Sequence, residues 1–127
     1  MDKKFDVVIV GTGAAGLYAA LNFPESVNIL LVSKRELQLS NSSLAQGGVA
    51  CVLDTVHDSY KLHITDTLIA GKYKNTLSAV EKLVTEGPSD VLKIKDLGVD
   101  FDLNEDGTMC KTLEAGHSRN RIVHHKD

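Results

Sequence analysis

The chain has 127 residues, of which 43% are hydrophobic, and its 14 Lys and Arg against 17 Asp and Glu give a net charge of −3 at pH 7. A chain of this length buries roughly two-thirds of its unfolded surface, so we expect one folded domain over residues 1–127 and not a disordered chain. The slight acidity and the scattered cations argue against a nucleic-acid partner. The sequence has neither an apolar run long enough to span a bilayer nor the pattern of a signal peptide. We therefore expect a cytoplasmic protein with no membrane span.

The N-terminal part predicts a strand, a helix and a second strand. Phe5–Val10 is a β-branched run that stops at a glycine, as a parallel strand covered on both faces does. Ala14–Asn22 consists of good helix formers, and Pro24 ends the segment. Val27–Val32 is a second apolar run. This order within about thirty residues predicts a βαβ unit with a right-handed crossover, and therefore an α/β fold class.

The middle of the chain predicts a loop followed by a helix. Ser40–Gly48 is polar, small and rich in glycine, and we expect a functional loop there. Asp58 or Ser59 is expected to cap a helix that ends near Gly71. Cys51 lies 59 positions before the second cysteine, too far for a Cys-x-x-Cys pair, so both cysteines are expected to be reduced packing thiols.

The C-terminal part predicts two helices and a hairpin. Thr76–Glu86 and Ser89–Leu97 are amphipathic and are expected to be separate helices parted by Gly87-Pro88. Val99–Asp102 alternates like a half-buried strand and precedes the turn signal Asp106-Gly107. A hairpin is therefore expected around this turn.

The segment Gly11-Thr12-Gly13-Ala14-Ala15-Gly16 follows a predicted strand and opens a predicted helix, the setting in which G-x-G-x-x-G indicates a dinucleotide site. Gly11 allows a tight turn, Gly13 lets the backbone approach a pyrophosphate, and Gly16 permits close packing of helix on strand. An ordinary NAD site would place an acidic residue about twenty residues further on. Ser33-Lys34-Arg35 stands there instead, which disfavours NAD. The alternative for the glycine segment is a purely structural turn.

The loop Glu114–Arg121 is dense in titratable side chains. His117 stands close to Glu114 among small residues and could line a substrate pocket; the alternative is a solvated loop histidine. His63 is expected in packing or at the surface, and the charged stretch 119–127 is expected to be solvated. The five histidines match no zinc pattern, so no metal site is expected.

Several segments together resemble a known family. They are Asp6–Gly16, Val32-Ser33-Lys34, Leu44–Ala50, Asp66–Gly71 and Glu114–Ser118, in this order along the chain. They resemble the N-terminal part of the L-aspartate oxidases, in the succinate dehydrogenase/fumarate reductase flavoprotein superfamily. The resemblance covers essentially the whole chain, and the Ala-Gln-Gly-Gly and Asp-Thr-Leu-Ile-Ala-Gly segments are its most restricted parts.

The resemblance implies a Rossmann-like FAD-binding core with additional helices and the C-terminal hairpin, and a non-covalent FAD. The implied cofactor-binding residues are Gly11, Thr12, Gly13, Ala14, Ala15, Gly16, Ser33, Lys34, Asn41, Ser42, Ser43, Leu44, Ala45, Gln46, Gly47 and Gly48. Asn41 stands where the membrane-bound relatives have a histidine that bonds covalently to the flavin. Asparagine cannot form that bond, which favours the oxidase branch.

The resemblance also implies a substrate and a reaction. L-aspartate would be oxidised to iminoaspartate, with oxygen or fumarate as the acceptor, for quinolinate and NAD synthesis, and quinolinate synthase would be a pathway partner. Glu114 and His117 are the implied substrate-binding residues, because a carboxylate at 114 can pair with an α-ammonium group that succinate lacks.

Family members are several times longer, so the chain is expected to be incomplete relative to them, to lack the capping and helical domains and the catalytic residues, and to be inactive alone. Two alternatives remain open: a fragment of a fumarate reductase or succinate dehydrogenase flavoprotein, and a non-catalytic nucleotide-binding module.

Overall fold

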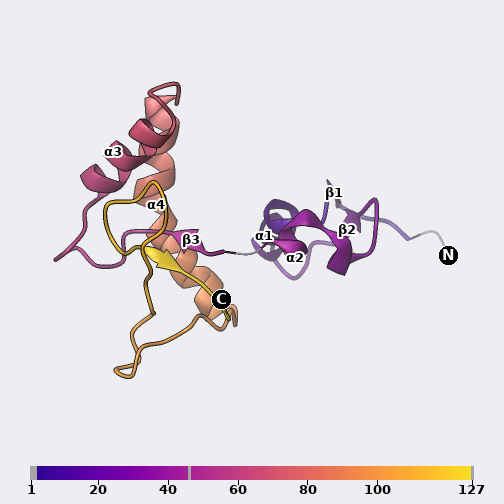
Figure 1. Cartoon of the computed structure of the whole chain (residues 1–127). Coiled ribbons are helices and arrows are strands. Elements are labelled where there is room, and N and C mark those ends of the chain that lie inside the picture. Colours follow the sequence, from indigo (N-terminus) through magenta and orange to yellow (C-terminus); the bar gives the residue numbers. More distant parts are fainter. Residues whose placement is uncertain (1–2, 46, 127) are drawn as a thin grey trace. The chain divides into compact units, whose positions relative to one another are not determined.

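The computed structural model describes residues 3–45 and 47–126, drawn in Figure 1. The chain divides into two compact units, residues 1–46 and residues 47–127. In the described residues, no helix has both the length and the apolar character needed to cross a bilayer.

The first unit contains the predicted strand, helix and strand, each shorter than predicted. Strand β1 (Val7–Val10), helix α1 (Ala14–Leu21) and strand β2 (Ile29–Val32) follow one another along the chain. The two strands pair in parallel, from Val7 opposite Ile29 to Val10 opposite Val32. The glycine segment therefore connects the carboxyl end of β1 to the start of α1.

The expected loop at Ser40–Gly48 instead begins with a short helix. A 3₁₀ turn, η1 (Leu37–Leu39), precedes helix α2 (Asn41–Leu44). The Ser40 hydroxyl accepts a hydrogen bond from the backbone N–H of Ser43 at 3.1 Å, which is the geometry of a helix N-cap. The serine that we interpreted as a loop residue is the residue that starts this helix.

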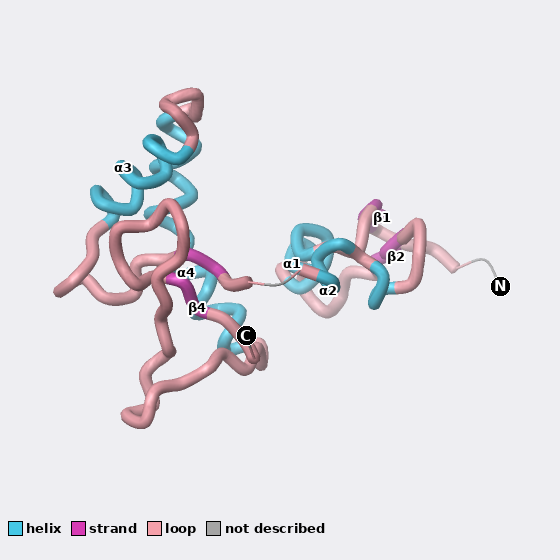
Figure 2. Tube along the Cα trace, viewed as in Figure 1, coloured by secondary structure: helices cyan, strands magenta, loops and turns pink. Residues whose placement is uncertain are grey.

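The second unit packs two helices and a small antiparallel pair (Figure 2). Strand β3 (Val49–Ala50) pairs with β4 (Ile122–Val123), and helix α3 (Tyr60–Ala70) contacts helix α4 (Leu77–Asp96). Its core consists of Cys51, Val91, Phe101 and Val123, with Leu53 and Met109 packed against them. Both cysteines are free thiols, as predicted. The expectation that residues 119–127 are solvated is wrong for residues 121–123, which are buried, whereas residues 119, 120, 125 and 126 are exposed.

Helix α4 is continuous through Pro88, so the prediction of two separate helices is wrong. Proline removes one backbone hydrogen bond from a helix interior, at a cost of about 3 kcal/mol. Val84, Pro88 and Val91 are buried and follow one another at spacings of four and three, so they share one face of the helix. The burial of this apolar face offsets the missing hydrogen bond.

At the predicted C-terminal hairpin, the structure has a tight turn closed by a single β-bridge and no paired strands. Leu103 and Met109 form an isolated antiparallel bridge, and the N–H of Asn104 donates to the carbonyl of Thr108 at 2.8 Å. Gly107 has a φ of +81°, as a tight turn requires. Val99–Asp102 contains no strand.

Candidate functional site

The glycine turn in the first unit is built by close backbone approaches. A Cβ atom on Gly16 would lie 2.0 Å from the carbonyl oxygen of Gly11, so only glycine lets α1 approach the turn this closely. Gly11 has a φ of +108°, which L side chains rarely adopt. Gly13, the N-cap of α1, has no side chain to cap the first helical turn. The start of α1 is therefore accessible to an anion.

Two hydrogen bonds connect the glycine turn to other segments of the first unit. The Thr12 hydroxyl donates to the Ser33 hydroxyl oxygen at 2.9 Å, which joins the ends of the two parallel strands. The N–H of Ala14 donates to the Ser42 hydroxyl oxygen at 3.0 Å. Thr12 is itself buried, so the turn is fixed from two sides.

A pocket of about 460 Å³ lies at this turn. Its lining includes Gly11, Thr12, Gly13, Ser33, Lys34, Arg35, Glu36 and Asn41. The partial positive charge of a helix N-terminus and the Lys34 and Arg35 cations favour the same kind of ligand, an anion such as a pyrophosphate.

The remaining predicted cofactor residues are divided between the units. Ser42 and Ser43 line a second pocket of the first unit, of about 420 Å³, together with Thr12 and Leu17. Leu44 and Ala45 are exposed, and Gln46 lies outside the described residues. Gly47 and Gly48 belong to the second unit, where a Cβ on Gly48 would lie 2.3 Å from the Val123 carbonyl oxygen.

The predicted substrate residues lie in one turn of the second unit. The carbonyl of Glu114 accepts from the N–H of His117 at 3.2 Å, and Gly116 within the turn has a φ of +85°. Glu114 is exposed, whereas His117 is partly buried.

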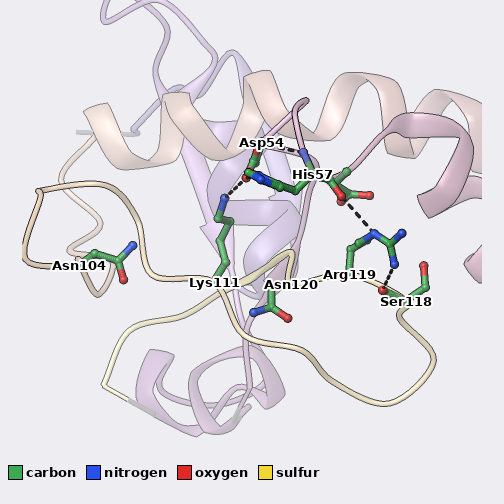
Figure 3. A pocket seen from close by; sticks show the side chains of 8 residues that line it. Asp54, His57, Asn104, Lys111, Ser118, Arg119 and Asn120 are labelled. Carbon is green, nitrogen blue, oxygen red and sulfur yellow. Dashed lines mark hydrogen bonds and ion pairs between the residues drawn. The ribbon is translucent and has the colours of Figure 1, made fainter.

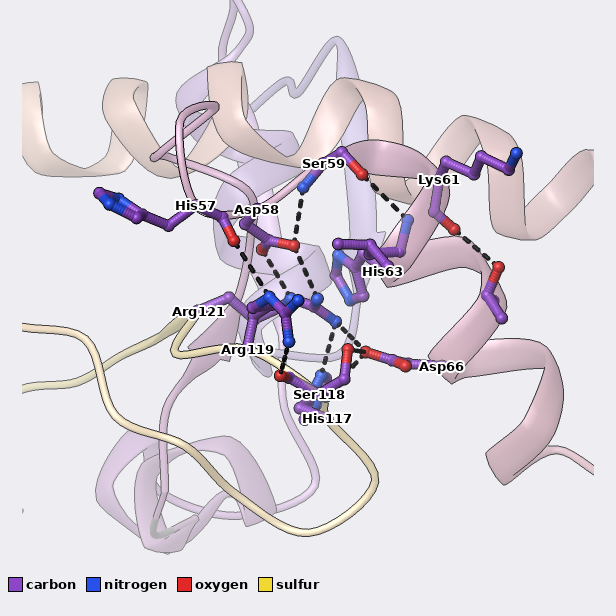
Figure 4. Close-up of polar contacts among 12 residues, drawn as sticks. His57, Asp58, Ser59, Lys61, His63, Asp66, His117, Ser118, Arg119 and Arg121 are labelled. Carbon is purple, nitrogen blue, oxygen red and sulfur yellow. Dashed lines mark hydrogen bonds and ion pairs between the residues drawn. The ribbon is translucent and has the colours of Figure 1, made fainter.

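The residue after this turn that sequence reasoning missed is Arg121 (Figure 4). Its side chain is buried, with 0% of the residue exposed. Its Nε and Nη2 donate to the two carboxylate oxygens of Asp58, each at 2.8 Å, and its Nη1 donates to Asp66 at 2.7 Å. Asp66 also accepts from the N–H and the hydroxyl of Ser118, at 2.9 and 2.8 Å. One guanidinium thus holds two carboxylates, and one of these holds the residue after His117.

The charges in this cluster shift the pKa values of its members. Burial opposes ionisation of Asp66, but the hydrogen bonds from Ser118 and the pairing with Arg121 outweigh it and hold the pKa of Asp66 below its ordinary value. Burial likewise opposes the charge of Arg121, and the bonds to Asp58 and Asp66 outweigh it and raise its pKa. Burial, followed by the charge of Arg121, lowers the pKa of His63. These shifts favour the charged forms of Asp66 and Arg121 and the neutral form of the His63 imidazole beside them.

A polar pocket of about 380 Å³ lies beside this cluster (Figure 3). Asp54 on its wall accepts from the Lys111 ammonium at 3.2 Å and pairs with His57 Nδ1 at 3.0 Å. These bonds, the contact with His57 first, lower the pKa of Asp54. Arg119, also on the wall, donates through Nε to the His57 carbonyl at 3.1 Å. The cations of this pocket already have partners.

Sequence reasoning had little basis for finding the Arg121 cluster. Asp58 and Arg121 are 63 positions apart, and no local motif connects them. Asp66 is the exception, because it begins the Asp-Thr-Leu-Ile-Ala-Gly segment that supported the resemblance.

A parallel strand pair with a glycine turn and a basic pocket at its carboxyl end defines the class, a dinucleotide-binding α/β protein. Residues 6–127 match the family described as FAD binding domain. The chain belongs to this family, and its cofactor is FAD.

Curated relatives of the chain include L-aspartate oxidases. The chain is 46% identical over 127 residues to that of Clostridium perfringens, covering all of this chain and 28% of the relative. It is 45% identical to that of a Nostoc species, covering 98% of this chain and 21% of the relative. The chain thus spans about a quarter of the length of these relatives.

The similar solved structures are flavoproteins of the superfamily that the sequence indicated. Sdh1 of Mycobacterium smegmatis matches with a TM-score of 0.86 at 31% identity, over 94% of this chain and 20% of that one. Quinol fumarate reductase FrdA of E. coli matches with a TM-score of 0.86 at 29% identity, over 94% of this chain and 21% of that one. The fold is that of the FAD-binding domain of these proteins, a mixed α/β fold.

Proposed function

We propose that this chain forms part of the FAD-binding domain of an L-aspartate oxidase, which oxidises L-aspartate to iminoaspartate with oxygen or fumarate as the acceptor, in the route to quinolinate and NAD. One observation carries the proposal: the pocket at the glycine turn has the donors of a pyrophosphate site, in a chain 46% identical throughout to an L-aspartate oxidase.

The residues at the glycine turn fit FAD. A Cβ on Gly13 would lie 3.0 Å from the Ser42 hydroxyl oxygen, so glycine lets the turn pack closely against Ser42. The same turn lines the pocket with backbone and no side chain at Gly11 and Gly13. Gly11, Thr12, Gly13 and Ala14 would hold the pyrophosphate, and Lys34 would lie near the adenosine end of the cofactor. Asn41 has no imidazole, so the cofactor is bound non-covalently. FAD supplies the two-electron acceptor for the hydride that leaves the substrate Cα.

Glu114 and His117 would contribute to the substrate side. The exposed Glu114 carboxylate can pair with the α-ammonium of aspartate, and the partly buried His117 in the same turn can hydrogen-bond a carboxylate. In this proposal, Glu114 selects amino-dicarboxylates over plain dicarboxylates.

A second candidate is a flavoprotein that interconverts succinate and fumarate, which the TM-score of 0.86 with FrdA supports. Asn41 and Glu114 favour the oxidase. The two functions make opposite predictions for the preferred substrate.

The cofactor part is tested by FAD titration of the protein expressed from its own gene, followed by flavin fluorescence. Lys34→Met should weaken FAD binding about tenfold or more, since a hydrogen bond to a charged group contributes about 1.5–3 kcal/mol. Lys4→Met is the matched control, because it removes an exposed cation from the same unit outside the pocket. Equal effects of the two variants contradict the proposed site.

The substrate part is tested by the ratio of turnover with aspartate to turnover with succinate in the same protein. Glu114→Gln should lower this ratio, whereas Glu105→Gln, at another exposed position, should leave it unchanged. A ratio unaffected by Glu114→Gln contradicts the role of Glu114.

A further inference from the structure

We infer that Arg121 is a positioning residue that fixes His117 in the tautomer with its proton on Nε2, so that His117 presents a hydrogen-bond donor to a carboxylate ligand. The relevance to aspartate rests on the proposed function, but the tautomer follows from contacts within the second unit alone.

The tautomer follows from the donors and acceptors of the two side chains. Arg121 Nη1 lies 3.3 Å from His117 Nδ1. A guanidinium has five N–H donors and no acceptor, so His117 Nδ1 must be the acceptor in this hydrogen bond. A neutral imidazole that accepts at one ring nitrogen carries its proton on the other. His117 therefore has its proton on Nε2.

The direction of this hydrogen bond is fixed because Arg121 has no freedom to turn. Asp58 binds its Nε and Nη2 in a two-point contact, and Asp66 binds its Nη1. The side chains of Arg121 and Asp58 are only 1% and 3% exposed, so water does not compete for these bonds. A planar guanidinium held at all three nitrogens keeps one orientation.

The same cluster holds the backbone that carries His117. Asp66 accepts from both the N–H and the hydroxyl of Ser118, the next residue. On the other side, the rings of His63 and His117 lie 5.5 Å apart at an interplanar angle of 58°, and His63 is buried. Figure 4 shows His117 and Ser118 beside the contact between Arg121 and Asp66. His117 is thus held through its ring and through its neighbour in the chain.

This arrangement determines what His117 can bind. Because Nδ1 accepts from the Arg121 guanidinium, the N–H that His117 can offer to a ligand is the one on Nε2. An N–H donor binds an acceptor oxygen, and a carboxylate oxygen is the strongest such partner in a dicarboxylate. In the proposed oxidase, Glu114 would bind the ammonium and His117 Nε2 a carboxylate oxygen of the same substrate.

The tautomer is measured directly by long-range ¹⁵N–¹H NMR of the histidine rings in the full chain, at about pH 8, where an ordinary imidazole is neutral. The chain contains its own references. His57 and His124 each place Nδ1 3.0 Å from an aspartate oxygen, of Asp54 and Asp102. The pKa values of both carboxyls are lowered, chiefly by hydrogen bonds. Both carboxylates can therefore only accept, and both rings must carry a proton on Nδ1.

We expect unprotonated Nδ1 and protonated Nε2 at His117, the reverse of the pattern at His57 and His124. A protonated Nδ1 at His117 in the unmodified chain overturns the inference without any variant having to fold. In Arg121→Met, the tautomer preference of His117 should be lost. Arg119→Met removes an exposed arginine that donates to the backbone carbonyls of His57 and Ser118, and should preserve the preference.

The kinetic counterpart uses Ser118→Ala in the protein expressed from its own gene. Losing one of the two bonds to Asp66 should raise the KM for aspartate with little change in kcat, since it loosens a binding turn. An unchanged KM contradicts the positioning role. If the tautomer is as expected while Glu114→Gln leaves the aspartate preference intact, the proposed function fails and the assignment of Arg121 stands.

Discussion

The two units of this chain build their sites in opposite ways. At the glycine turn, the important feature is the absence of side chains, because a Cβ on Gly16 would meet the Gly11 carbonyl at 2.0 Å. At the Arg121 cluster, the important feature is a long charged side chain that is fully buried and bound at every nitrogen. The glycine turn and its contacts join residues at most 28 positions apart, whereas the Arg121 cluster joins residues 55 and 63 positions apart.

This difference predicts different responses to substitution. A site made of backbone fails when atoms are added, whereas a buried ion network fails when atoms are removed.

The largest effect is expected for Arg121→Met, which leaves the buried Asp58 carboxylate without its partner. Breaking a buried ion pair on one side costs about 3–5 kcal/mol, measured as the free energy of unfolding in urea followed by circular dichroism. Lys82→Met is the control, because the Lys82–Glu86 pair has side chains 73% and 57% exposed; it should leave stability unchanged. Similar losses in both variants would mean that burial of Arg121 does not matter.

Gly16→Ala should destabilise the first unit by about 1–3 kcal/mol, the usual range for overpacking, and should weaken FAD binding. The same substitution at Gly87 in helix α4 should have the opposite effect and stabilise the second unit. A Cβ there meets nothing within 4 Å, and alanine is better than glycine in a helix by about 1 kcal/mol. Thermal and urea unfolding of the two variants should therefore shift in opposite directions, and a shift in the same direction contradicts this account.

The pH dependence of stability should show the buried imidazole of the second unit. The pKa of His63 is lowered from 6.5 by burial, and then by the charge of Arg121, against the opposing carboxylates of Asp58 and Asp66. Below about pH 6.5, His63 therefore binds a proton more readily in the unfolded chain than in the folded chain. Stability falls as the pH drops below that value. In His63→Leu, this fall between about pH 7.5 and about pH 5 should be smaller.

The Asp66 carboxylate affects the stability of the fold in a lower pH range. The pKa of Asp66 is held below 3.8, so its contribution is present above that pH and is lost as the pH falls below it. If His63→Leu changed the pH dependence of stability only below pH 3.8, the loss of stability between about pH 7.5 and about pH 5 could not be assigned to His63.

The smallest effect concerns thiol reactivity in the second unit. Burial raises the pKa of Cys51 to about 11, so at neutral pH this buried thiol is protonated and shielded. Cys110 is only partly buried. Alkylation with iodoacetamide should therefore modify Cys110 first, and mass spectrometry after partial reaction identifies the modified residue. In Arg121→Met, Cys51 should become more reactive, whereas Gly16→Ala should leave it protected.

The sequence predicted the first unit well because its signals are local. Val7–Val10, the glycine segment and the helix from Ala14 form one continuous pattern, and each part specifies the next. The resemblance to the L-aspartate oxidases predicted the family and FAD correctly, because it used ordered segments along the whole chain. The site roles of Glu114, His117 and the cofactor residues stay predictions.

The errors in the second unit have physical causes. Arg121 looked solvated because isolated arginines usually are, and its two carboxylate partners come from a distant part of the chain. Pro88 looked like a helix boundary because proline breaks isolated helices, but a buried apolar face continues through it. Ser40 looked like a loop residue, although serine is also a preferred N-cap. At Arg121 and Pro88, tertiary contacts outweighed the local preference of the residue. At Ser40, a helix cap did.

The distance in sequence between Asp58 and Arg121 also has a kinetic consequence. Because a chain is synthesised from its N-terminus, the parallel strands and the glycine turn can form once residue 32 has emerged from the ribosome. The ion network must wait for residue 121, with Asp58 and Asp66 already synthesised and their negative charges unpaired. The Asp58–Arg121 contact closes a segment of 63 residues, and contacts between residues so far apart in sequence form slowly relative to local pairing. During synthesis, the part of the molecule that is most deeply buried at the end is therefore the last to be protected from proteases and aggregation.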